Sequence, residues 1–151
     1  MTSINWTRVL LGGLVAGVII NISEGLLNGV FLAQNWADAM KALNRPEISG
    51  SAIAMFNVMG FGIGIFTIWL YAAMRPRFGA GLKTALGAGL ATWVIGSLLP
   101  SVPPLVIHLY SRRLVAIGVV VGLIELLVGA AAGAYLYKEA AEPNQARVAR
   151  A

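Results

Sequence analysis

Four long apolar runs separated by short polar connectors constrain this chain more than any other feature. A bilayer core about 30 Å thick needs about 20 apolar residues in a helix, and the runs at residues 9–33, 52–74, 82–99 and 114–137 reach or approach that length. Hydrophobic residues make up 58% of the sequence and charged residues 11%, which leaves too little polar surface to coat a water-soluble globule. We therefore predict an all-α, integral membrane four-helix bundle, surrounded by the lipid bilayer and forming a single transmembrane domain over residues 1–151.

The connector after the first run predicts a short additional helix. In "NWADAMKALNRP", the apolar residues Trp36, Met40 and Leu43 recur at helical spacing, with charged residues on the other faces. Pro46 cannot continue a helix and ends this stretch. We expect an interfacial helix over about residues 35–45, lying along the membrane surface.

Three prolines predict a break after the third run. They are Pro100, Pro103 and Pro104. Proline lacks the backbone N–H that a helix interior needs, and its ring clashes with the preceding turn. We therefore expect the third helix to stop near Leu99 and to be followed by an apolar connector at the membrane surface.

Lysine and arginine residues near the ends of the runs predict the orientation. One side carries Arg8, Arg75, Arg77, Lys83, Lys138, Arg147 and Arg150, and the other carries Lys41, Arg45, Arg112 and Arg113. Positive residues are retained on the cytoplasmic side, so both termini are predicted to be cytoplasmic in a bacterial inner membrane, with 138–151 as a short tail. Because these charges are scattered rather than gathered on one face, no nucleic-acid partner is expected.

Polar residues inside the apolar runs mark the candidate site. Glu24 lies in the first run within "NISEGLLNG", and Glu125 lies in the middle of the fourth. A charged side chain at the bilayer centre costs about 2.5 to 3.5 kcal/mol, so it normally faces protein or water. Asn21, Glu24 and Asn28 are spaced by three and four residues, which places them on one helix face.

We expect the first and fourth helices to be neighbours and their acids to share one layer. The predicted polar intramembrane centre consists of Asn21, Glu24, Asn28, Asn57 and Glu125. Two interpretations remain open at this point. The side chains can hold the helices together through hydrogen bonds worth about 1 kcal/mol or less each, or the carboxyls can bind cations and couple them to protons.

Glycines recur along the same helix faces as the polar residues. The predicted helix-packing positions are Gly17, Gly60, Gly64, Gly118, Gly122 and Gly129, and Gly60 with Gly64 forms a GxxxG pair. Such small residues let membrane helices approach closely. The pattern favours close packing within the chain, and association with a second copy or with a larger membrane complex.

Enzyme chemistry finds little support in the sequence. The chain has no cysteine, its serines lack a positioned histidine base, and no phosphate-binding pattern such as GxxxxGK[ST] occurs. The one histidine, His108, lies in the connector after the third run, where we expect an interfacial side chain rather than a metal ligand. We therefore predict a non-enzymatic protein without a cofactor or metal.

Two stretches carry a resemblance to a known family. The first run ends in "GVFLAQNWADAMKAL", where Phe31 and Trp36 precede a short amphipathic stretch, and the last run follows an arginine pair in "SRRLVAIGVVVGLIELLVGAAAGAYLY". On these stretches the sequence resembles a family of small four-span bacterial membrane proteins catalogued as a domain of unknown function. The resemblance covers most of the chain and implies a four-span fold, but no activity. The chain departs from it at Asn28 and Gly29, where an aromatic pair would be expected.

A second resemblance concerns the glutamate of the first run. The small multidrug resistance transporters also have four short spans and one essential glutamate in the first, and Glu24 is the matching position. This chain is longer, carries a second membrane glutamate at Glu125, and has longer connectors. The sequence thus predicts an accessory or structural four-span protein with a buried polar centre. The alternative is a small proton-coupled transporter of cationic or small polar solutes.

Overall fold

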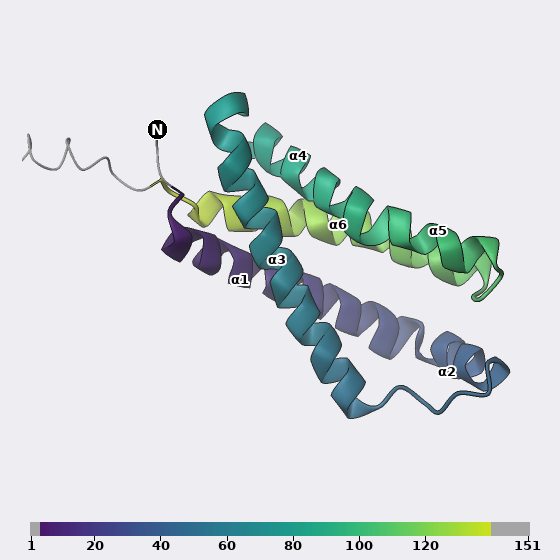
Figure 1. Cartoon of the computed structure of the whole chain (residues 1–151). Coiled ribbons are helices and arrows are strands. Elements are labelled where there is room, and N and C mark those ends of the chain that lie inside the picture. The colour runs from purple at the N-terminus through teal and green to yellow at the C-terminus, as the bar shows by residue number, and fades with distance from the viewer. Residues whose placement is uncertain (1–3, 140–151) are drawn as a thin grey trace, which may run out of the picture.

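The computed structural model describes residues 4–139, which form helices joined by short connectors (Figure 1). The α-helices are α1 (Trp6–Leu26), α2 (Ala33–Ala42), α3 (Gly50–Phe78), α4 (Leu82–Trp93), α5 (Leu99–Val106) and α6 (Arg112–Leu136). Two π-helical segments, η1 (Leu27–Phe31) and η2 (Val94–Leu98), extend α1 and join α4 to α5. The prediction of an all-α bundle with a short helix after the first span is confirmed.

Four helical segments are long and apolar enough to cross a membrane: Trp6–Phe31, Gly50–Phe78, Leu82–Val106 and Arg112–Leu136. They coincide with the four apolar runs of the sequence and mostly begin or end a few residues away from them. Serine and asparagine side chains fix three of their N-termini, since Asn5, Ser49 and Ser111 each accept a hydrogen bond from a backbone N–H of the first turn. The predicted tail extends beyond residue 139 and lies mostly outside the described residues.

The third span corrects the expectation of a proline break. It continues through Pro100, Pro103 and Pro104 to Val106 instead of stopping near Leu99. The wider turn of η2 immediately precedes Pro100, and there the Leu99 N–H bonds to the Val94 carbonyl five residues back. This widened turn relieves the crowding that a proline ring imposes on the preceding turn. The missing N–H of Pro100 falls at the start of α5, where proline is tolerated.

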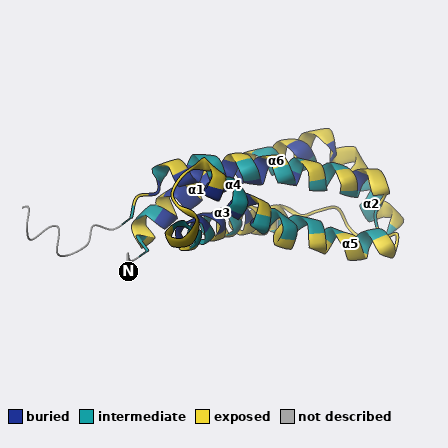
Figure 2. Cartoon of the chain, turned by 90° about the horizontal axis from the view of Figure 1, so that it is seen from above, coloured by how far each residue is buried: buried dark blue, intermediate teal, exposed yellow. Residues whose placement is uncertain are grey.

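The helices pack closely at one end of the bundle and separate at the other (Figure 1). We call the end that holds the N-terminal half of α1, the C-terminal halves of α3 and α6, and α4 the closed end. The opposite end, with η1, α2, the N-terminal half of α3 and η2–α5, is the open end. Seen from above, buried residues concentrate at the closed end and exposed residues at the open end (Figure 2).

The closed end contains the main apolar core. Its buried residues are Val9, Ala16, Ile68, Tyr71, Ala72, Ala85, Ala88, Ala134 and Tyr137. Small residues dominate this list, so the helices approach closely and leave little space between them. The open end has a smaller cluster in which Leu27, Leu32 and Leu114 join η1 to α6.

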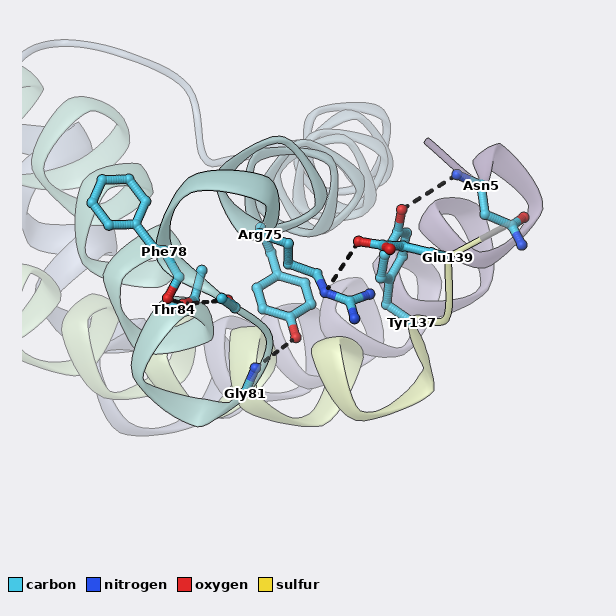
Figure 3. A network of polar contacts seen from close by, with 9 residues as sticks. Asn5, Arg75, Phe78, Gly81, Thr84, Tyr137 and Glu139 are labelled. Atoms are coloured by element: carbon cyan, nitrogen blue, oxygen red, sulfur yellow. Dashed lines mark hydrogen bonds and ion pairs between the residues drawn. The ribbon is translucent and has the colours of Figure 1, made fainter. Parts of the chain in front are cut away.

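A polar network closes the surface of the closed end (Figure 3). The Arg75 guanidinium lies 5.7 Å from the Tyr71 ring centroid and 5.1 Å from that of Tyr137, and its Nε lies 3.7 Å from a Glu139 carboxylate oxygen. The Tyr71 hydroxyl accepts a hydrogen bond from the Gly81 N–H at 3.2 Å. These contacts tie α3 to the α3–α4 connector and to the C-terminus of α6.

Candidate functional site

A cavity of about 1300 Å³ occupies the open end. One wall is the N-terminal half of α3, and the others come from α1–η1, α2, η2–α5 and the N-terminal half of α6. The cavity exists because α3 crosses the bundle and leaves α4 toward its own N-terminus (Figure 1). It therefore lies between candidate membrane spans of the same chain, and α2 and the connector after it also line it.

The charged side chains that line the cavity are all acidic. They are Glu24, Glu47 and Glu125, and no lysine or arginine contributes to the lining among the described residues. Most of the remaining wall is apolar, with aromatic side chains from Trp36, Phe56 and Tyr110. A surface of this kind suits a positively charged or hydrogen-bond-donating ligand with an apolar body.

All the predicted residues of the polar centre border this cavity: Asn21, Glu24, Asn28, Asn57 and Glu125. The Asn21 Nδ2 donates to the Asn57 backbone oxygen at 3.0 Å, which joins α1 to α3. The Asn57 side chain bonds instead within its own helix, donating to the Ile53 carbonyl oxygen at 2.9 Å. Asn57 therefore contributes its backbone, and not its amide, to the contact with the first span.

A chain of hydrogen bonds connects the short helix α2 to the glutamate of the first span. The Trp36 Nε1 donates to the Asn28 Oδ1 at 2.8 Å, and the Asn28 Nδ2 donates to the Glu24 carboxylate. Because an indole N–H can only donate, it fixes which end of the Asn28 amide faces Trp36 and directs the amide NH₂ toward Glu24. Trp36 itself is held edge-on against Tyr110, with ring centroids 5.4 Å apart.

Glu125 is the deepest acid of the cavity. It is 6% exposed, and its Oε2 has no hydrogen-bond partner among residues 4–139. From α6 its carboxyl faces Ser23 and Glu24 of α1, so the two membrane acids are neighbours. A buried carboxyl oxygen without a partner is costly in a low-dielectric interior, and a bound cation or proton would relieve that cost.

The predicted glycine positions differ in what surrounds them. An added Cβ at Gly64 would lie 2.5 Å from the Gly13 carbonyl oxygen, and additions at Gly17 and Gly60 would also overlap the neighbouring helix. Gly122 and Gly129 have looser contacts, at 3.0 Å from Ser97 and 3.4 Å from Ala16 respectively. A Cβ at Gly118 would meet nothing within 4 Å, because Gly118 borders the cavity rather than another helix.

Sequence reasoning missed several residues that shape this region. It did not single out Gly12, Gly13, Gly89 and Gly133, whose added Cβ atoms would overlap other helices, nor the cavity-lining Ser97. It also gave no partner to the indole of Trp36, which donates a hydrogen bond to Asn28. The Asn28–Trp36 spacing of eight residues was the available signal, but η1 changes the helical register between them, so a regular helix could not be extrapolated.

Comparisons with protein-family models, with curated proteins and with solved structures find no match to this chain. The resemblances seen in the sequence therefore identify no family. The fold and the four candidate spans define the class: this is a four-span integral membrane protein in contact with the lipid bilayer. Among the described residues, no three His, Cys, Asp or Glu side chains gather where they could hold a metal ion.

Proposed function

We propose that the protein is a small, non-enzymatic membrane carrier that binds a cationic solute in the open-end cavity and exchanges it for a proton. The observation that carries this proposal is the cavity itself: among residues 4–139 its charged side chains are all acidic, and Oε2 of Glu125 at its base has no hydrogen-bond partner. A packing role for the acids needs no cavity of about 1300 Å³ beside them. Carboxyls buried in membrane proteins commonly mark ion and proton pathways.

In this proposal the roles of the two acids differ because their partners differ. Glu24 accepts a hydrogen bond from the Asn28 amide, while the described part of the chain offers no such donor to the Oε2 of Glu125. An entering cation is attracted to Glu24 and displaces a proton shared with Glu125. Two adjacent carboxyls hold protons as a pair, so charge can be exchanged without leaving two bare negative charges at mid-depth.

We further propose that both termini are cytoplasmic and that the cavity opens toward the opposite side. In support, the closed end carries Arg8, Arg75, Arg77, Lys83 and Lys138 among the described residues, against Lys41, Arg45, Arg112 and Arg113 at the open end. Arg147 and Arg150 lie outside the described residues. Since the chain has no cysteine, single cysteines at Ser51 and Arg77, labelled with a membrane-impermeant maleimide on intact cells, test the orientation directly.

The test of function is binding of tetramethylammonium, a cation that carries no exchangeable proton. Purified protein in nanodiscs should bind it and release protons into a weakly buffered solution, as measured with a pH-sensitive dye. Glu24→Gln and Glu125→Gln should each abolish the proton release and weaken binding by about tenfold or more. Glu47→Gln, at an exposed position of the cavity wall, is the matched control and should change either quantity by less than about twofold. Binding that is unchanged in both membrane-acid variants would refute the proposal.

A second candidate function is that of an accessory subunit. It is favoured by the N-terminal half of α3, where no residue from 50 to 59 is buried. A second copy or a larger membrane complex would cover this half and fill the space beside it. The mass of the native species after gentle extraction from its own membrane tests this candidate: co-purification at fixed stoichiometry with larger subunits supports it, and a lone monomer refutes it.

A further inference from the structure

A second, smaller cavity lies where the chain leaves α2 toward α3. It has a volume of about 430 Å³ and is lined by α2 and by the connector that follows it, both at the open end of the bundle (Figure 1). Its charged side chains are of both signs and balance: Asp38 and Glu47 are acidic, and Lys41 and Arg45 are basic. This cavity therefore differs from its larger neighbour, whose charged lining is acidic alone among the described residues.

The turn that ends α2 brings these charges together. Asn44 has a φ of 51°, in the left-handed region that asparagine tolerates better than most residues. Its N–H bonds to the Lys41 carbonyl oxygen at 3.1 Å, and the Arg45 N–H bonds to the Met40 carbonyl oxygen at 2.9 Å. This pair of bonds is a Schellman motif, which closes the helix and changes the direction of the chain. As a result, Arg45 and the residues after it line the same cavity as the last turns of α2.

The opposite charges of this cavity do not pair with one another. The one salt bridge among residues 4–139 joins Arg75 to Glu139 at the closed end, so none joins the acids and bases that line the cavity. Asp38 accepts a hydrogen bond from the Gln34 amide at 2.9 Å, which orients its carboxylate. A ligand that carries both signs would pair with the acids and the bases at once, and the occupied site would remain neutral.

The position of the cavity in the chain favours a lipid headgroup as this ligand. The first candidate span ends at Phe31 and the second begins at Gly50, and the residues that line the cavity all lie between these two ends. The stretch just beyond the ends of two spans lies beside the headgroup layer of the bilayer. Phosphate and ammonium groups fixed in that layer have a far higher local concentration than a free solute.

We propose that this cavity binds the headgroup of a phospholipid with a phosphate and a primary ammonium group, as in phosphatidylethanolamine. The Arg45 guanidinium and the Lys41 ammonium hold the phosphate, because both are strong donors to phosphate oxygens. The Asp38 carboxylate accepts hydrogen bonds from the ligand's ammonium, and Glu47 completes the charge balance. The site goes beyond the proposed function and does not depend on it, since Asp38, Lys41 and Arg45 do not line the larger cavity.

The lining also discriminates against other common headgroups. The quaternary ammonium of phosphatidylcholine has no N–H to donate to Asp38, and no aromatic side chain of the described residues lines this cavity to contact it instead. Phosphatidylglycerol carries the phosphate without a cation, so it would leave Asp38 and Glu47 unpaired beside a negative charge. The expected order of affinity is therefore phosphatidylethanolamine above both of the others.

Stepwise methylation of the headgroup tests the hydrogen bonds to Asp38. The purified full chain, stripped of lipid in detergent, is titrated with dioleoyl phosphatidylethanolamine and with its mono-, di- and trimethyl derivatives, and native mass spectrometry counts the bound lipids. Affinity for the first lipid should fall by about fivefold or more from the primary to the quaternary ammonium, because each methyl group removes one N–H donor. Equal affinity along the series would overturn the proposal.

Two variants assign the two halves of the headgroup. Asp38→Asn should reduce the preference for the primary over the quaternary ammonium to less than about twofold, whereas Arg45→Gln should weaken every lipid of the series by about fivefold, since all carry the phosphate. Both residues are exposed, so both variants should fold. The matched control is Arg113→Gln, exposed at the same end but lining neither cavity, which should change affinity by less than about twofold. Equal losses in Arg45→Gln and Arg113→Gln would show a diffuse attraction for phosphate and overturn the site.

A water-soluble headgroup separates a lipid from a free solute as the ligand. Glycerophosphoethanolamine has the same phosphate and ammonium but no acyl chains, and it should displace the bound lipid only at concentrations about a hundredfold or more above that of the lipid. Displacement at matching concentrations would assign the cavity to a free zwitterion and overturn the lipid assignment. None of these measurements involves tetramethylammonium, so this inference and the carrier proposal can fail separately.

Discussion

The two ends of this bundle are built from the same kinds of residue but are packed in opposite ways. At the closed end, Gly13, Gly17 and Gly64 bring α1 and α3 into backbone contact. At the open end, an added Cβ at Gly25, Gly29, Gly96 or Gly118 would meet no atom of residues 4–139 within 4 Å, and these glycines line a cavity instead. This difference shows that a glycine in a membrane helix permits the close approach of a second helix but does not cause it. The crossing of α3 decides which glycines are covered.

The largest expected effect comes from a pair of glycines on the same helix. Gly64→Leu should destabilise the fold by about 3 kcal/mol, because its side chain would overlap the Gly13 and Gly17 backbones. Gly62→Leu, two residues away with nothing within 4 Å, should change the stability by less than about 0.5 kcal/mol. Unfolding by SDS titration in bicelles measures both. Equal effects would break the distinction between covered and uncovered glycines.

A smaller effect is expected for the polar network of the closed end. Arg75→Ala should lower the free energy of unfolding by about 1 to 2 kcal/mol, because it removes the contacts of the guanidinium with Tyr71, Tyr137 and Glu139. Arg77→Ala, at an exposed position of the same turn, is the control and should have little effect. Cation binding at the open end should be unchanged by either variant, and a loss of binding in Arg75→Ala would show that the two ends are coupled.

At the open end, removal of one hydrogen-bond donor should affect binding and not stability. Trp36→Phe keeps the ring against Tyr110 but loses the N–H that fixes Asn28, so Glu24 becomes less well positioned. We expect tetramethylammonium affinity to fall about fivefold, which corresponds to a net loss of about 1 kcal/mol. Trp69→Phe, at a partly buried position packed against the closed-end core, should leave the affinity unchanged. A stability loss in Trp36→Phe without a change in affinity would assign Trp36 to packing alone.

The smallest expected effect concerns the hydrogen bond that marks where α3 leaves the third span. The Thr67 hydroxyl lies 2.7 Å from the Ile63 carbonyl oxygen and 3.3 Å from the Thr92 hydroxyl. Thr67→Val should cost about 0.6 kcal/mol, the average for such bonds between membrane helices. A double-mutant cycle with Thr92→Val isolates the contact between the two spans. A coupling energy near zero would show that the hydroxyl pair does not hold the helices at this point.

Much of the fold followed from the sequence because the bilayer restricts the choices. A run of about 20 apolar residues in lipid must satisfy its own backbone hydrogen bonds, and a helix is the simple solution. The four spans and the short helix after the first were therefore predictable. The third span was the exception. Local rules for Pro100, Pro103 and Pro104 predicted a break, but the widened turn of η2 accommodates Pro100, and the helix continues through Pro103 and Pro104 to Val106.

The candidate site was predictable only in part. The spacing of Asn21, Glu24 and Asn28 fixes one face of one helix, and the structure places that face beside the cavity. Three other features depend on how separate helices pack. They are the proximity of Glu125 to Glu24, the orientation of the Asn57 amide away from α1, and the hydrogen bond from Trp36 to Asn28. Helical periodicity contains no information about the angle between two helices.

The sequence by itself determined that this chain spans the membrane, where its spans lie, and which polar side chains are buried in them. These properties follow from the free energy of transferring apolar and charged groups into lipid, and this free energy depends on each segment alone and not on how the segments pack. Only the tertiary structure decided that α3 crosses the bundle. This crossing packs the helices closely at one end and separates them at the other, where the glycines and the two acids line a cavity. That outcome depends on close contact between surfaces far apart in the chain, at Gly12 and Gly133 as at Gly13 and Gly64.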